Sequence, residues 1–199
     1  MSSPWRVEGE RVWRMGNRLP RADAATFRVL SFSFARDAER VWTPWHRVKA
    51  DAATFRALDR GVVHDDLGEP VAHGYGADRD VVVFSAGVGR PVRVAGAEPA
   101  AFLSLGGFFG HDARSCYSHG RPLRGADPGD WRIVDQRMLY STSGGRVYHA
   151  WRPVPADAAT FTTLTVTSAG RLRQVARDAE RFYLDGEPLS ERELAERLR

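Results

Sequence analysis

The feature that most constrains this chain is a five-residue motif that it repeats. The motif Asp-Ala-Ala-Thr-Phe occurs at residues 23–27, 51–55 and 157–161, and diverged copies occur at residues 98–102 and 127–131. Internal repetition of this kind predicts a fold built from modules of roughly thirty residues, each too small to bury its apolar face alone. It also disfavours an enzyme, because a catalytic site needs unlike groups that converge on one point.

Each copy of the motif has the chemistry of a capped turn. The aspartate at its first position can accept hydrogen bonds from backbone N–H groups at the start of a helical turn. Two copies carry proline at the second position, Pro99 and Pro128, where a missing N–H costs nothing. An aromatic residue ends the motif and an aliphatic residue follows three residues later, as in Phe27 and Leu30. This spacing predicts that both side chains share one face of a short helical turn.

The segments between the motifs predict β-hairpins. A β-rich run that ends in an aromatic residue, such as residues 146–148, precedes a phrase that contains proline, such as residues 151–154. Two or three residues separate the run from the phrase, which is the spacing of a tight hairpin, and the proline restricts its strand to the edge of a sheet. An acidic residue before the run is expected to close a turn onto its own backbone. The acids in question are Asp37, Asp80, Asp112 and Asp178.

The sequence therefore predicts a mostly β fold: a β-hairpin repeat array with short helical turns between modules and a C-terminal capping helix. A capping box of Ser190 and Glu193 begins that helix, which is expected from Glu191 to Arg199. We expect residues 1–199 to form a single repeat-built domain. Its modules are expected at roughly residues 5–30, 31–58, 59–105, 106–134, 135–164 and 165–199, and the third is irregular with an extra hairpin.

Charge and composition argue against several classes of protein. The net charge is +4, and Lys49 is the only lysine. The arginines are interleaved with acids, whereas proteins that bind nucleic acid cluster their positive charge, so nucleic acid is not an expected partner. No apolar run is long enough for a membrane span or a signal peptide. A single cysteine, Cys116, excludes an internal disulfide framework. These observations predict a cytoplasmic protein with no membrane partner.

The hairpin at residues 177–186 reads Arg-Asp-Ala-Glu-Arg-Phe-Tyr-Leu-Asp-Gly, and its order of acid, turn and aromatic-ending strand recurs along the chain. This pattern resembles the bacterial DKNYY family over about residues 5–190. The family has Lys-Asn where this chain has Ala-Glu or Ala-Arg, and a tyrosine pair where this chain has Val-Trp, Cys-Tyr or Phe-Tyr. The resemblance implies a bacterial protein made of β-hairpins, with no catalytic residues to transfer. Proteins of this kind occur in polymorphic toxin settings, where an immunity role is expected.

Two groups of residues are candidates for a binding site. The irregular third module holds the densest set of metal-ligating side chains, which are His64, Asp65, Asp66 and His73. Such loop residues can bind a divalent metal, although they are more commonly solvated, and we predict neither a metal nor a cofactor. The second group is Trp45 and Trp151, which replace hairpin glycines. An exposed ring beside arginines is a common anchor in protein interfaces, and the alternative is that each ring covers its neighbouring repeat.

The sequence thus predicts a non-enzymatic, cytosolic, protein-binding repeat protein. Its most concrete form is an immunity protein that occludes the domain of a cognate toxin. Two alternatives remain at this point. One is a metal-assisted hydrolase that uses the histidines and aspartates of the irregular segment, and the other is a binder of glycan or envelope ligands through Trp45 and Trp151.

Overall fold

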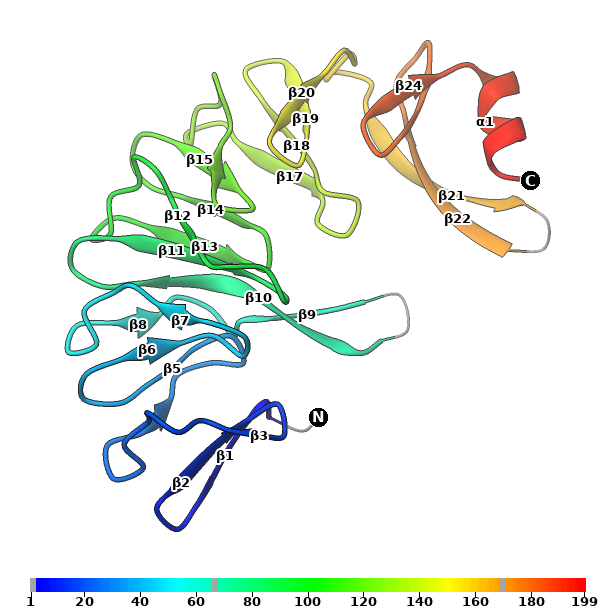
Figure 1. Ribbon diagram of the computed structural model, residues 1–199. Helices are drawn as coiled ribbons and strands as arrows, with labels where there is room; N and C mark the ends of the chain where they lie inside the picture. Colours follow the sequence, from blue (N-terminus) through cyan, green and yellow to red (C-terminus); the bar gives the residue numbers. More distant parts are fainter. Residues whose placement is uncertain (1–2, 66–67, 169–170) are drawn as a thin grey trace. The chain divides into compact units, whose positions relative to one another are not determined.

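The computed structural model describes residues 3–65, 68–168 and 171–199. Over these residues it contains 24 short antiparallel strands in six small sheets and one C-terminal helix (Figure 1). The predicted fold class is therefore confirmed. Contacts divide the chain into two compact units, which are residues 1–113 with 119–121 (unit 1) and residues 114–118 with 122–199 (unit 2).

Unit 1 begins with three sheets of short strands. The first contains β1 (Trp5–Glu8), β2 (Arg11–Arg14) and β3 (Asn17–Arg18). The second contains β4 (Arg28–Val29), β5 (Ala35–Arg36), β6 (Val41–Trp42) and β7 (Arg47–Val48). The third contains β8 (Arg56–Ala57), β9 (Val62–His64), β10 (Pro70–Ala77), β11 (Val82–Ala86) and β12 (Val92–Arg93).

The following four strands lie in the sequence around the boundary between the units. They are β13 (Leu103–Gly106), β14 (Phe109–His111), β15 (Cys116–Ser118) and β16 (Arg121–Pro122). Unit 2 continues with two further sheets. One contains β17 (Arg132–Asp135), β18 (Tyr140–Ser143), β19 (Arg146–His149) and β20 (Arg152–Val154). The other contains β21 (Thr162–Ser168), β22 (Arg171–Arg177), β23 (Phe182–Leu184) and β24 (Glu187–Leu189), and the helix α1 (Glu191–Arg197) follows it.

The hairpins form where the sequence predicts them. Asp185 and Gly186, between β23 and β24, have φ angles of 51° and 82°, and this pair of positive angles matches the twist of a two-residue hairpin turn. The prolines of the hairpin phrases in unit 2 lie on the edge strands β20 and β24. Proline there removes a backbone donor at an edge that is otherwise open to another strand.

The motif turns are single turns, and their two apolar residues do not share a face. Phe27 packs with Trp5 and Trp42, whereas Leu30 packs against the next cluster, which contains Phe34 and Phe55. The expectation of one common face is therefore wrong. The physical reason is that residues 28–29 form strand β4, and residues an odd number apart on an extended chain point to opposite sides. This motif thereby links two successive cores, and so does the motif at residues 157–161, where Phe161 and Leu164 pack against different clusters.

Two additions to the repeat are visible in Figure 1. The extra hairpin of the third module is confirmed, because β9 pairs with β10 and His64 lies opposite Pro70. At the other end, Ser190 caps α1 and Glu193 completes the predicted capping box. The helix packs through Leu194 on Val175 and Leu189 of the last sheet.

Candidate functional site

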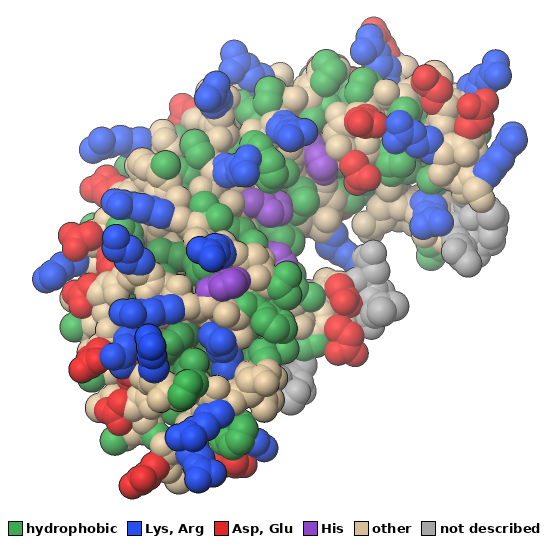
Figure 2. Space-filling model, in the orientation of Figure 1, with side chains coloured by type: hydrophobic (Ala, Val, Ile, Leu, Met, Phe, Trp, Pro, Cys, Tyr) green, Lys and Arg blue, Asp and Glu red, His purple; other side chains and the backbone are tan. Residues whose placement is uncertain are grey.

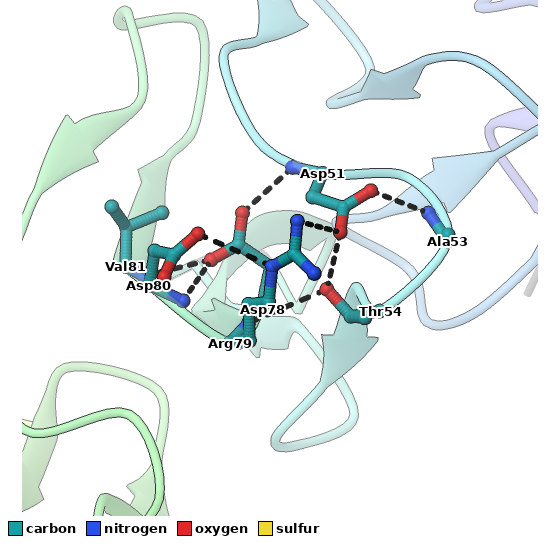
Figure 3. A network of polar contacts seen from close by, with 7 residues as sticks. All are labelled: Asp51, Ala53, Thr54, Asp78, Arg79, Asp80 and Val81. Carbon is teal, nitrogen blue, oxygen red and sulfur yellow. Dashed lines mark hydrogen bonds and ion pairs between the residues drawn. The ribbon is translucent and has the colours of Figure 1, made fainter.

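The most prominent polar feature inside the protein is a network at the joint between modules (Figure 3). In unit 1, Asp78 is buried, with 2% of its surface exposed. One of its carboxylate oxygens accepts hydrogen bonds from the backbone N–H groups of Asp80 and Val81, each at 2.7 Å. The other accepts from the N–H of Asp51 at 2.7 Å. Asp78 therefore closes its own turn and also holds the preceding motif.

The motif completes the joint from its own side. The Asp51 carboxylate accepts hydrogen bonds from the Ala53 N–H at 3.1 Å and from the Thr54 hydroxyl at 3.0 Å. The Thr54 oxygen in turn accepts from the N–H of Arg79 at 3.4 Å. The aspartate thus closes the motif turn and orients the threonine, and the threonine bonds the backbone of the distant segment, which accounts for the repetition of both residues.

The same joint recurs in both units. The backbone N–H at the first position of each motif donates to a side chain further along the chain, and the pairs are Asp23 to Asp37, Glu98 to Asp112, Asp127 to Ser143, and Asp157 to Asp178. Because these acids are occupied by backbone partners, we assign them a structural role and not a catalytic one. Serine at position 143 retains the acceptor without the charge.

The joint corrects one assignment made from the sequence. In the third module the sequence predicts that Asp80 closes the turn, but Asp78 has that position. Asp80 lies on the surface, where its carboxylate is 3.4 Å from the guanidinium of Arg79 and its side chain is 72% exposed. The turn therefore begins two residues earlier than expected, and Ala77 pairs with Val82 across it.

The joint of unit 2 has a strongly stabilised carboxylate. Burial alone raises the pKa of Asp178, but hydrogen bonds from the Tyr183 hydroxyl and from the backbone N–H groups of Asp157, Glu180 and Arg181 outweigh it and bring the pKa to about 2. The carboxylate is therefore charged at neutral pH. Burial raises the pKa of Tyr183, and the hydrogen bond to the charged Asp178 carboxylate raises it further.

The structure does not bring the predicted histidines and aspartates of the third module together. His64 and Asp65 are exposed, His73 is half-buried, and Asp66 lies outside the described residues. His64 pairs with Pro70, and His73 lies three residues further along β10. An odd separation places side chains on opposite faces of a hairpin, roughly 10 Å apart along the strand. Over residues 3–65, 68–168 and 171–199, no cluster of three metal-ligating side chains is found.

His73 belongs instead to an aromatic cluster in unit 1. Its ring centroid lies 4.9 Å from that of Phe108 and 6.3 Å from that of Phe84. Burial lowers the pKa of His73 below its ordinary value of 6.5, and a hydrogen bond with the backbone of Val71 offsets this only in part. The folded chain therefore binds this proton less readily than the unfolded chain. The contribution of neutral His73 to the free energy of unfolding is therefore present above pH 6.5. It is lost as the pH falls below that value.

We expect the substitution His73→Phe to weaken this loss of stability in acid, because phenylalanine keeps the ring contacts and cannot take up a proton. The measurement is urea unfolding at about pH 5.5 and about pH 7.5, on either side of the ordinary histidine pKa. Burial also lowers the pKa of His149 in unit 2, so the pH dependence should shrink and not vanish. His64→Gln, exposed on the same hairpin, is the matched control. An unchanged pH dependence in His73→Phe would contradict the assignment.

The two candidate tryptophans differ in exposure. Trp45 lies in the turn between β6 and β7 and is 38% exposed. The buried Thr43 holds this turn, since its hydroxyl oxygen accepts hydrogen bonds from the N–H groups of Trp45 at 3.4 Å and His46 at 3.0 Å. Trp151 is half-buried, and the guanidinium of Arg152 lies 5.7 Å from its ring centroid. Trp45 is therefore the better-presented ring of the two.

A basic groove of about 420 Å³ in unit 1 runs beside the Trp45 turn. Four cations line it, Arg47 and Lys49 at β7 and Arg90 and Arg93 at β12, and no acidic residue of the described chain does. His46 lines its edge and approaches the Val88 carbonyl oxygen at 3.0 Å through Nε2. Figure 2 shows Lys and Arg side chains gathered over the region where Figure 1 labels β7 and β12. The name basic groove is used below for this groove, which is defined by Arg47, Lys49, Arg90 and Arg93.

Sequence reasoning missed the groove because its cations come from segments about forty residues apart. In the sequence the arginines are scattered among acids, which indicates dispersed charge. One local signal was available: the hairpin phrases place arginine on the last strand of two successive sheets, as at Arg47 of β7 and Arg93 of β12. Edge strands of successive modules that lie next to each other bring such positions together.

Comparison of the chain with protein-family models, with curated proteins and with solved structures finds no match. Among the described residues, no helix combines the length and apolar character that crossing a membrane requires.

Proposed function

We propose that this chain is a non-enzymatic protein-binding repeat protein, and that its binding surface is the Trp45 turn with the adjoining basic groove. The observation that carries the proposal is an exposed indole beside four cations on one surface of unit 1. Tryptophan and arginine are the residues that most often dominate the binding energy of protein interfaces.

The apolar surroundings of Trp45 support the same function. Val88 is 71% exposed and Val92 is 40% exposed. The contact of His46 with the Val88 carbonyl ties the turn of Trp45 to the turn between β11 and β12. Because Thr43 already orders the Trp45 turn, little conformational entropy is lost when a partner binds there.

The most concrete form of this function is an immunity protein in the bacterial cytoplasm. Such a protein acts by covering the functional surface of a cognate toxin domain, so it needs a rigid surface and no catalytic groups. The resemblance of the hairpins to the DKNYY family supports this form by analogy. The joints support the immunity function as well, because hydrogen bonds to backbone groups engage the repeated acids in holding the fold.

We expect the chain to form a stable complex with the product of a neighbouring reading frame, and Trp45→Ala to weaken that complex by at least about thirtyfold, the effect of losing one dominant interface residue. Titration calorimetry with the purified pair measures this. Val29→Ala, at an exposed site of unit 1 outside the groove, is the matched control and should change the affinity little.

Two outcomes would contradict the proposal. One is the absence of any complex with the neighbouring gene products. The other is turnover of a substrate in a broad hydrolase screen by the same preparation.

A further inference from the structure

Resting on the proposed function, we propose that the basic groove recognises an acidic polypeptide segment of the partner, with carboxylates bound by Arg47, Lys49, Arg90 and Arg93. The proposed function leaves the chemistry of the partner open, and the charge of the groove identifies it as carboxylate. The reasons are the charges in the groove, its strand edges and its apolar rim.

The four cations lack the ion pairs that Arg40 and Arg79 of the same unit have. In the described chain, none of their side chains has an ion pair or a hydrogen bond. By contrast, Arg79 lies 3.6 Å from the carboxylate of Asp51 and Arg40 lies 3.0 Å from that of Glu39. Like charges that line one groove repel one another, and a bound anion relieves the repulsion. The groove is therefore a site for negative charge supplied from outside the chain.

We expect the side chains of the groove to bind the acidic segment. Pairing of the segment as an added β-strand is not expected. Strands β7 and β12 are two residues long each, and Pro91 has no N–H to donate beside β12. A partner strand would find few backbone groups to pair with. Guanidinium groups bind carboxylates through two parallel hydrogen bonds, so Arg47 and Arg93 suit glutamate or aspartate side chains.

The rim of the groove favours a polypeptide over a nucleic acid. Single-stranded nucleic acid needs successive aromatic side chains on which its bases stack. Here the exposed ring of Trp45 lies near the exposed aliphatic side chains Val88 and Val92, and the ring of His46 is already engaged with the Val88 carbonyl oxygen. Aliphatic groups next to cations match a peptide that carries both carboxylates and apolar side chains.

The test compares two double variants with equal changes of charge. Arg47→Glu/Arg93→Glu alters the groove, and Arg11→Glu/Arg60→Glu alters exposed arginines of unit 1 outside it. Each double variant removes two positive charges and adds two negative ones, so both fall from the net charge of +4 to 0. Fluorescence anisotropy measures binding of a labelled glutamate-rich peptide at about 0.01 M salt, where charges are screened weakly. An equally long glutamine-rich peptide and an oligothymidylate are the comparison probes.

We expect the glutamate-rich peptide to bind the unaltered chain, and the groove variant to bind it at least about tenfold more weakly than the matched variant. Equal weakening in both variants would overturn the proposal, because net charge alone would then explain the binding. Absence of peptide binding would overturn it, as would tighter binding of the oligothymidylate or equal binding of the glutamine-rich peptide. Melting temperatures of both variants establish that they are folded.

The same variants separate this proposal from the proposed function. If the partner complex forms but survives Arg47→Glu/Arg93→Glu unchanged, the groove does not recognise the partner, and the protein-binding function stands with the Trp45 turn alone as its surface. If the acidic peptide binds but no neighbouring gene product does, the proposed function fails and the groove keeps its specificity for carboxylates.

Discussion

Replacing Asp78 with alanine is expected to lower the free energy of unfolding by about 3 kcal/mol or more, since each buried group left without its partner costs about 1–3 kcal/mol. Three backbone N–H groups, those of Asp51, Asp80 and Val81, lose their acceptor in this variant. Two of them belong to the turn and the third to the preceding motif, so one substitution loosens both sides of the joint. Urea unfolding followed by circular dichroism measures the change.

Asp80→Ala is the matched control for this prediction. Its carboxylate is mostly exposed and faces Arg79 on the surface, so the expected loss is within about 0.5 kcal/mol. Asp78→Asn should lie between the two variants, because it keeps one acceptor oxygen. Equal losses for Asp78→Ala and Asp80→Ala would show that the joint does not stabilise the fold as described.

The second large effect is expected from Phe55→Ala, which should cost about 3–5 kcal/mol of stability. Phe55 is 3% exposed, and its ring packs edge-on against Phe34 with centroids 5.3 Å apart. The ring also lies directly over Gly76, where an added Cβ would come within 2.5 Å of its Cζ. Alanine therefore leaves a cavity bounded by a backbone segment and a rigid ring, which collapse only in part.

Leu103→Ala is the control for Phe55→Ala, because Leu103 is an aliphatic residue of unit 1 that is 58% exposed. It should change the free energy of unfolding by less than about 0.5 kcal/mol. Phe55→Leu, which refills much of the volume, should recover a large part of the loss. A cost for Phe55→Ala no greater than that for Leu103→Ala would contradict the packing of this core.

Several elements of the fold could be predicted from local sequence. The hairpins depend on turn residues such as Asp185 and Gly186, and the helix depends on a capping box between Ser190 and Glu193. These signals lie within a few residues of one another, so the sequence alone displays them. The binding role of Trp45 remains a prediction, but its exposure agrees with its place in a hairpin turn.

Other features depend on contacts between distant segments. Asp78 and Asp80 are equally plausible turn acids in the sequence, and only the register of β10 and β11 buries the first. A further pattern is present in the sequence, but only the structure explains it: a large residue, a small residue and a joint acid recur at fixed spacing, as in Tyr75, Gly76 and Asp78. The small residue makes room for the motif aromatic ring, as Gly76 does for Phe55.

The sequence by itself determined that this protein is a mostly β array of hairpins with a helical cap. Those properties follow from the local conformational preferences of the turn, strand and cap residues. Only the tertiary structure decided which acid closes each joint and which residues share a core. It alone brought Arg47 and Arg93 to one groove, because packing of successive modules brings together charges that lie far apart in the chain.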